Sequence, residues 1–431
     1  MPDLRASLPL PGAYLNRQSM KIKAFKGFRP VPSKAQSVAS RPYDVLDSEE
    51  ARDEAKGNPF SFLNVVKPEI TLRPETDHYS AEVYEAGKRN FQNLVDEGVF
   101  IQDKDECLYL YELTMDGRSQ NGIVACASVD DYMEGRIKKH ELTRPDKEAD
   151  RKNHVRVSMM NAEPVFFAYP ANQDLDSIIS NIKQAEPVYS FVADDNIKHR
   201  LWVIHKQEDV NNIVSAFEKI PATYVADGHH RTAAAALVGD DLRKENPNHT
   251  GDESYNYFLA VHFPDNELSI LDYNRVVKDL NGQTKESFID GLEAAFQVEK
   301  KGKDAYRPSR LHEFGMYLDG EWFALTAKHG MYQDDDAIGV LDVTILSEKV
   351  LKPLLNIHDL RTDKRIDFVG GMRGLQELER RVDSGEMKVA FALYPVSMKQ
   401  LIDIADSGKI MPPKTTWFEP KLRSGLVVHK F

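Results

Sequence analysis

The sequence predicts a mixed α/β fold (α+β) with several antiparallel hairpins. Asp-Gly or Asp-Asn pairs separate short apolar runs at Asp116-Gly117, Asp265-Asn266 and Asp319-Gly320, a pattern typical of β-hairpins. Other stretches place apolar residues at helical spacing. The chain has 431 residues, of which 41% are hydrophobic and 29% charged. This size and composition are sufficient for the cores of roughly two to three domains.

In the first half of the chain, prolines within residues 25–46 predict strands and turns rather than a regular helix. Ser48 is expected to cap a short helix. A longer helix is predicted over 76–98, with Gly98 as its C-cap. The charged segment 129–156 is predicted to form a loop and a helix. Strands are predicted at 108–113, 123–128, 164–169, 201–205 and 223–226, with a helix at 210–219.

In the second half, a hairpin is predicted from 257–263 and 268–271, and another from 314–317 and 322–325. Helix and strand then alternate, with a glycine turn at 370–374. Helices are predicted at 343–355, from that turn to about 381, and at 398–406, and strands near 368 and at 389–394.

The predicted domain organisation has three parts. Residues 1–19 are expected to form a flexible tail, and 20–297 a first region that binds nucleotide and substrate. Residues 298–431 are expected to form a second α/β region that packs on the site. The boundary is placed at the hydrophilic segment 298–309.

Composition excludes several classes of protein. The formal net charge of −12 argues against nucleic acid as a partner, since a phosphate backbone favours basic surfaces. The two cysteines, Cys107 and Cys126, provide neither a disulfide framework nor a zinc pattern. No apolar run reaches the roughly 18 residues that a membrane span needs. We therefore expect a cytoplasmic protein that does not enter membranes. P-loop and Rossmann glycine motifs are missing from the sequence.

The strongest functional signal lies within residues 224–237. There an apolar run ends in an Asp-Gly pair, and two histidines and an arginine follow where an alanine-rich helix begins. A helix N-terminus presents unpaired N–H groups and a partial positive charge, and glycine lets a ligand approach the backbone. A phosphate or carboxylate site is therefore predicted; a capped helix with solvent-facing histidines is the alternative. The residues are Asp227, Gly228, His229, His230, Arg231 and Thr232.

A second polar cluster spans residues 138–151. Phosphoryl transfer needs cations that hold charge and a carboxylate that orients the nucleophile or a magnesium ion. This segment supplies both, with Glu141 or His140 as general base and Glu141 as a metal ligand. A solvated charged surface is the alternative. The candidate residues are His140, Glu141, Thr143, Lys147 and Arg151.

Two proline-containing segments are candidates to line the same pocket. The turn at 41–44 presents Tyr43 and Asp44, and Asp44 is the second choice for the catalytic carboxylate. The segment 411–426 supplies a basic rim for phosphate. Tyr43, Asp44, Thr143 and Lys414 are thus expected to bind substrate. A well-formed turn and an interdomain strap are the alternatives. The polar residues of the rim are Lys414, Thr415, Lys421 and Arg423.

Several blocks in order resemble a bacterial and archaeal family, the domain of unknown function numbered 1015. The resemblance covers nearly the whole chain from Met20. The blocks are 25–30, 41–45, 140–143, 226–231 and 411–426. The Asp-Gly-His-His-Arg block is also similar to the phosphate-binding motif of the ParB/sulfiredoxin superfamily, which includes kinases that act on free serine.

That second resemblance implies a ParB/sulfiredoxin-like nucleotide-binding core. It implies that Gly228, His229, His230 and Arg231 hold nucleotide phosphates, and that Asp227 contacts magnesium or the substrate hydroxyl. Sulfiredoxin chemistry needs a cysteine in this turn, and none is present.

Together these observations predict a phosphotransferase that uses ATP or ADP with Mg²⁺ and acts on a small hydroxylated metabolite such as free serine. Asp227, Glu141 and His140 would be catalytic, with Asp227 and Glu141 as metal ligands. Lys147 and Arg151 would stabilise the transferred charge. The alternative is a nucleotide-binding regulatory or switch protein of ParB-like type without phosphotransfer. A homodimer is possible in either case.

Overall fold

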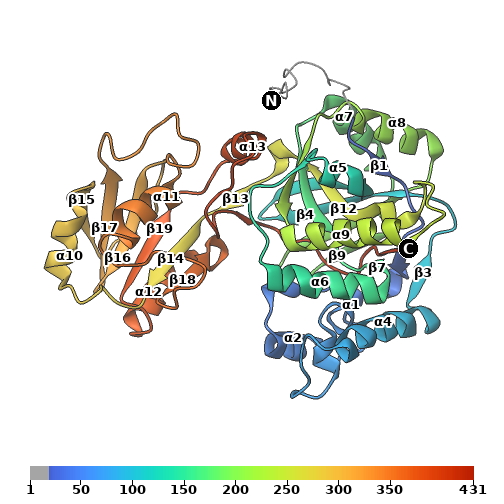
Figure 1. Cartoon of the computed structure of the whole chain (residues 1–431), viewed down its shortest axis with the longest axis horizontal. Helices are drawn as coiled ribbons and strands as arrows, with labels where there is room; N and C mark the ends of the chain where they lie inside the picture. Colours follow the sequence, from blue (N-terminus) through green and yellow to red (C-terminus); the bar gives the residue numbers. More distant parts are fainter. Residues whose placement is uncertain (1–18) are drawn as a thin grey trace, which may run out of the picture.

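The computed structural model describes residues 19–431 and has a mixed α/β fold with a larger and a smaller lobe (Figure 1). The expected tail at 1–19 lies, apart from Ser19, outside the described residues. The larger lobe contains a nine-stranded sheet with the order β6-β11-β8-β12-β5-β4-β10-β9, and β1 pairs with β5. Its strands are β1 (Ile22–Lys23), β4 (Leu108–Met115), β5 (Arg118–Ser128), β6 (Ile137–Lys138), β8 (Val165–Tyr169), β9 (Tyr189–Val192), β10 (Lys198–Ile204), β11 (Thr223–Asp227) and β12 (Tyr257–Pro264).

Alternating side chains of β4 belong to two different hydrophobic clusters. Leu108 and Leu110 pack in a cluster with α7 and α8, whereas Tyr109 and Tyr111 belong to the cluster on the opposite face. This is the period of two expected of a strand that is covered on both faces. Helix α6 packs on α9, and α4 packs on α6. The helices of this lobe include α2 (Ser48–Ala55), α4 (Ala81–Asp96), α5 (Val129–Met133), α6 (Pro145–Ser158), α7 (Gln173–Ile182), α8 (Gln207–Phe217) and α9 (His229–Glu245).

The smaller lobe contains a six-stranded antiparallel sheet with the order β15-β17-β16-β19-β14-β18. The boundary expected at residue 298 falls inside β15, and β14 already belongs to this sheet. The strands are β14 (Tyr273–Val277), β15 (Phe296–Gly302), β16 (Glu313–Leu318), β17 (Glu321–Ala327), β18 (Ile366–Gly370) and β19 (Val389–Leu393). The helices include α10 (Lys285–Leu292), α11 (Asp342–Leu346), α12 (Gly374–Asp383) and α13 (Met398–Asp406).

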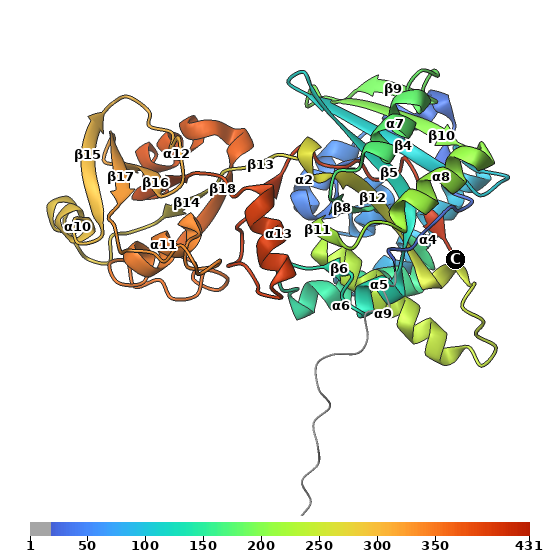
Figure 2. The same cartoon turned by 90° about the horizontal axis from the view of Figure 1, so that it is seen from above.

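After α13 the chain returns to the larger lobe, and we call residues 411–431 the C-terminal strap (Figure 2). Strand β20 (Trp417–Phe418) pairs with β13 (Ile270–Leu271), and β21 (His429–Lys430) pairs with β7 (Met160–Asn161). The hairpin predicted from 257–263 and 268–271 is therefore wrong, because β13 pairs with the strap instead of with β12. A partner from the distant C-terminus outcompetes the local turn.

Local sequence signals otherwise located most elements. The hairpins β4–β5 and β16–β17 turn at Asp116-Gly117 and Asp319-Gly320, as predicted. The cap predicted at Ser48 is wrong by one residue, because the Asp47 carboxylate accepts the N–H groups of Glu49 and Glu50. Cys107 and Cys126 are buried and free among the described residues.

Candidate functional site

The turn between β11 and α9 forms the centre of the site. Gly228 has φ of +89°, a left-handed conformation that L side chains rarely adopt. Thr232 closes the first turn, since its N–H and its Oγ1 both donate to the Gly228 carbonyl, at 2.9 and 3.0 Å. Within residues 19–431, no side chain caps this end of α9. The first-turn N–H groups therefore remain available to an anion.

The alanine run of α9 places this turn close to the sheet. Residues 233–236 are all buried, and such small side chains let the helix lie directly on its neighbours. The turn is thus held by a packed core on one side, which favours a rigid site.

Arg231 braces the turn. Its side chain is 7% exposed. Nη1 donates to the Pro164 carbonyl at 2.8 Å, and Nη2 lies 3.7 Å from carboxylate oxygens of both Asp44 and Asp227. Burial would lower the pKa of Arg231, but these carboxylates and Glu163 raise it. The guanidinium therefore stays charged and draws two carboxylates to the start of α9.

Asp227 lies between two cations. Its Oδ2 is 3.3 Å from the Lys421 Nζ in the C-terminal strap and 3.7 Å from Arg231. Burial alone would raise the pKa of Asp227, but Lys421 and Arg231 outweigh it and lower the pKa to about 2. Asp227, Asp44 and Lys421 are 28%, 36% and 16% exposed, respectively. These three charged groups can therefore contact a ligand, whereas the buried Arg231 positions the carboxylates of Asp44 and Asp227.

A buried network lies behind Arg231. The Tyr43 N–H and the Ser424 hydroxyl both donate to Glu163 Oε1 at 3.0 Å. Arg151 stacks on the Tyr43 ring at 4.1 Å and pairs with Asp150 at 2.8 Å. Arg151, Glu163 and Arg231 are among the residues that line a small cavity of about 30 Å³. Tyr43 and Arg151 are thus buried residues that support the site from the protein interior.

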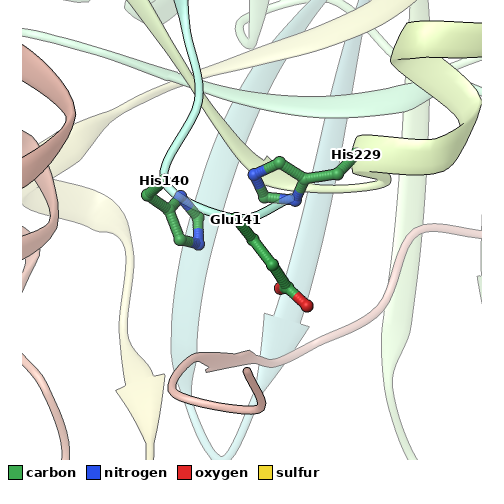
Figure 3. A group of neighbouring side chains, drawn as sticks. All are labelled: His140, Glu141 and His229. Carbon is green, nitrogen blue, oxygen red and sulfur yellow. The ribbon is translucent and has the colours of Figure 1, made fainter. Parts of the chain in front are cut away.

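His140, Glu141 and His229 form a second group at the same edge (Figure 3). The two imidazole rings meet edge to face, with centroids 4.5 Å apart. One potential ligand atom of each residue lies within 4.8 Å of those of the other two. Burial lowers the pKa of His140 to about 4 and that of His229 well below its usual value, and it raises the pKa of Glu141. The imidazoles are therefore neutral at neutral pH.

The C-terminal strap covers this group. The Met411 N–H donates to the His140 carbonyl at 2.8 Å, and Thr416 Oγ1 lies 3.1 Å from His140 Nε2. Lys414 is exposed and lowers the pKa of Glu141, against the effect of burial. The Lys414 Nζ also lies over the ring of Tyr273, from the smaller lobe, at 5.9 Å. The strap is thus both a link between the lobes and one side of the site.

The remaining predicted residues lie on the periphery. His230 Nε2 accepts the Arg144 N–H at 2.9 Å, and the Thr143 hydroxyl donates to Glu148 at 2.6 Å. The Lys147 Nζ lies 3.5 Å from the Tyr79 hydroxyl. The structure therefore brings the Asp-Gly-His-His-Arg turn together with Asp44, His140, Glu141 and the strap. Thr143 and Lys147 instead contact Glu148 and Tyr79 within a charged surface segment.

Two participants carry little sequence signal. Lys421 belongs to the basic rim predicted at 411–426, but its pairing with Asp227 joins residues 194 positions apart. Glu163 precedes a proline at the start of β8 and stands in no motif. Burial raises the pKa of Glu163, while Arg231 and Arg151 lower it. Only the folded chain reveals this buried carboxyl.

Comparison with known proteins gives a family and distant structural similarities. No curated protein matches the sequence. A free serine kinase variant in complex with AMP shares 11% identity, with a TM-score of 0.35, over 71% of this chain and 91% of that chain. A conserved hypothetical protein from Pyrococcus furiosus shares 15% identity, with a TM-score of 0.31, over 71% and 95%. C-terminally truncated SbnI from Staphylococcus aureus shares 13%, with a TM-score of 0.31, over 69% and 82%.

None of the helices described in residues 19–431 is long and apolar enough to cross a membrane.

The family comparison is decisive for classification, because it matches residues 22–344, about three quarters of the chain. The chain belongs to the family described as "Protein of unknown function (DUF1015)".

Proposed function

We propose that the protein is a nucleotide-dependent phosphotransferase that acts on a small hydroxylated metabolite. The observation that carries the proposal is the start of α9, which no side chain of the described residues caps. Lys421 of the strap lies beside it, because its Nζ is 3.3 Å from Asp227. Backbone N–H groups at a helix start, together with a lysine, are a common seat for phosphate groups. Gly228, with φ of +89°, supplies the left-handed turn that leads from β11 into this helix start.

The balance of charge at this seat supports a nucleotide that arrives with Mg²⁺. Lys421 and Arg231 are accompanied by Asp44, Asp227 and the buried Glu163. The carboxylates would repel a polyphosphate without a cation, whereas a bound Mg²⁺ makes the ligand complementary to them. ATP and ADP, as magnesium complexes, are therefore the first ligands to test.

The exposed carboxylates suit the acceptor. Asp227 and Asp44 each have a carboxylate oxygen 3.7 Å from Arg231 Nη2. One of them would orient the acceptor hydroxyl. The hydroxyl oxygen then bonds to the transferred phosphorus, the bond from phosphorus to the nucleotide oxygen breaks, and the hydroxyl proton passes to a carboxylate. Glu141, whose pKa is raised by burial, is the neighbouring proton acceptor.

Free serine is the first acceptor to test, because the turn is similar to the motif of kinases that act on it. The purified protein is incubated with ATP or ADP, Mg²⁺ and a panel of hydroxylated amino acids, and phosphorylated products are identified by mass spectrometry. We expect one product, lost in Asp227→Asn and Asp44→Asn but kept in the surface control Asp174→Asn, whose carboxylate is 65% exposed. Nucleotide binding without any product would favour the regulatory alternative. No binding of either nucleotide would refute both.

A further inference from the structure

We propose that His140, Glu141 and His229 bind one divalent first-row transition ion, such as Zn²⁺ or Fe²⁺, beside the proposed phosphate site. The three residues come from two segments far apart in the sequence, the loop after β6 and the first turn of α9. Folding brings one potential ligand atom from each to within 4.8 Å of the others (Figure 3).

The donor set selects the type of ion. Imidazole nitrogens suit zinc, copper, iron and nickel, whereas Mg²⁺ and Ca²⁺ prefer oxygen ligands. Two imidazoles and one carboxylate leave coordination positions open, as in catalytic rather than structural metal sites. The proposed ion therefore differs from the Mg²⁺ that accompanies a nucleotide.

Unsatisfied polar atoms are a second, independent observation. Among the described residues, His229 Nε2 has no hydrogen-bond partner, although His229 is only 7% exposed. A buried polar atom without a partner costs on the order of 1–3 kcal/mol. Coordination of an ion would satisfy such an imidazole nitrogen. His229 meets His140 with ring centroids only 4.5 Å apart, so the unsatisfied ring belongs to the proposed ligand cluster.

The geometry requires only a modest contraction. Bonds of about 2.0–2.2 Å to a four-coordinate ion place ligand atoms roughly 3.5 Å from one another, compared with at most 4.8 Å here. Glu141 lies on a loop and is half-buried, so its side chain can supply much of the movement. Thr416 Oγ1, 3.1 Å from His140 Nε2, helps to orient that imidazole, as second-shell partners of metal ligands do.

The protonation states are also compatible. Both histidines are neutral at neutral pH, because burial lowers the pKa of each. Neutral imidazole is the form that binds a metal ion. An ion at this place lies next to the first turn of α9, where an oxygen of a bound phosphate or carboxylate could complete its coordination. Glu141 and His140 would then be ligands, and orientation of the acceptor hydroxyl would belong to Asp227 and Asp44.

The test uses Co²⁺ as a coloured probe and the full-length protein after removal of metals by EDTA. Nucleotide is left out, so the result does not depend on the proposed phosphotransfer. Calorimetry and visible absorption measure Co²⁺ binding to the wild type and to Glu141→Gln, His229→Asn and His230→Asn. His230 is the matched control, because it lies in the same turn but outside the cluster.

We expect one Co²⁺ per chain, with ligand-field bands that Zn²⁺ abolishes and an equal concentration of Mg²⁺ does not. Glu141→Gln and His229→Asn should each weaken binding about tenfold or more, while His230→Asn should not. Circular dichroism checks the fold of each variant, and Glu141→Gln decides if His229→Asn fails to fold. The proposal is overturned if the wild type takes up no stoichiometric ion, or if Glu141→Gln binds Co²⁺ like the wild type.

Discussion

Replacement of Lys421 by methionine tests the proposed phosphate-binding site at the start of α9 most directly. The substitution keeps the length and apolar stem of the side chain but removes the ammonium group that lies 3.3 Å from Asp227. At an effective dielectric constant of about 20, such a pair has a gross attraction on the order of 5 kcal/mol. Desolvation and ordering offset part of this, and charge-assisted hydrogen bonds contribute a net of about 1.5–3 kcal/mol.

We therefore expect Lys421→Met to weaken nucleotide binding by roughly 10- to 150-fold, the equivalent of that net contribution. Two effects act together, because the variant lacks one cation that faces the phosphates and leaves the Asp227 carboxylate less neutralised beside them. Isothermal titration calorimetry with magnesium nucleotide measures the change in Kd. Lys219→Met is the control, since its ammonium pairs with Asp174 at 3.2 Å on the open surface.

A double variant separates the two effects. Asp227→Asn in the Lys421→Met background removes the carboxylate that has lost the nearer of its two cations, so we expect part of the lost affinity to return. Such non-additivity is the signature of two groups in direct contact. A Kd that changes no more in Lys421→Met than in Lys219→Met would refute the placement of phosphates at this end of α9.

Two further predictions concern backbone strain and a buried histidine. Gly228→Ala places a Cβ in the left-handed region, 3.2 Å from the Arg231 guanidinium, so denaturant unfolding should show a loss of about 1–2 kcal/mol and calorimetry a weaker nucleotide complex. Gly57→Ala, with φ of +78° and open space around it, should lose comparable stability but keep nucleotide binding; equal binding by both variants would contradict the prediction. Neither ring nitrogen of His262 has a hydrogen-bond partner within the described part of the chain, so His262→Leu should stabilise the fold by about 1 kcal/mol at pH 7.5. Burial lowers the pKa of His262 from 6.5 to about 3, and between these values only the unfolded state binds the proton. Wild-type stability is therefore lost as the pH falls from 6.5 towards 3. The free energy of unfolding that His262→Leu gains over the wild type should be larger at pH 5 than at pH 7.5 in denaturation experiments. A gain that is constant or smaller at pH 5 would show that His262 is not buried as a neutral group.

Local signals predicted the elements that depend on local chemistry. Asp116-Gly117 and Asp319-Gly320 turn their hairpins because Asp and Gly accept the left-handed backbone there, with φ of 50° and 78° at the first turn and 51° and 76° at the second. The hairpin predicted for residues 268–271 was wrong because its outcome depended on a distant segment. Their apolar pattern is that of a strand, but the pattern does not specify the partner, which is β20 of the strap.

The candidate site shows the same division at the level of single residues. The Asp-Gly-His-His-Arg turn was recognisable, because a strand, a glycine and a helix start follow one another directly in the chain. The role of Arg231 was not, since a sequence does not reveal that its guanidinium is 7% exposed and bonded to the Pro164 carbonyl. Glu163 and Lys421 likewise acquire a role only from neighbours that are distant in the sequence.

By itself, the sequence determined the mixed α/β class, most of the strands and helices and the position of the Asp-Gly-His-His-Arg turn. These follow from periodicity, turn chemistry and helix-end chemistry, all of which act over a few residues. Only the tertiary structure decided that the C-terminal strap closes the site, that Lys421 faces Asp227, and that His140 and Glu141 meet His229. Such contacts arise from how two lobes and a returning strap pack together, and packing between distant segments leaves no local trace in the chain.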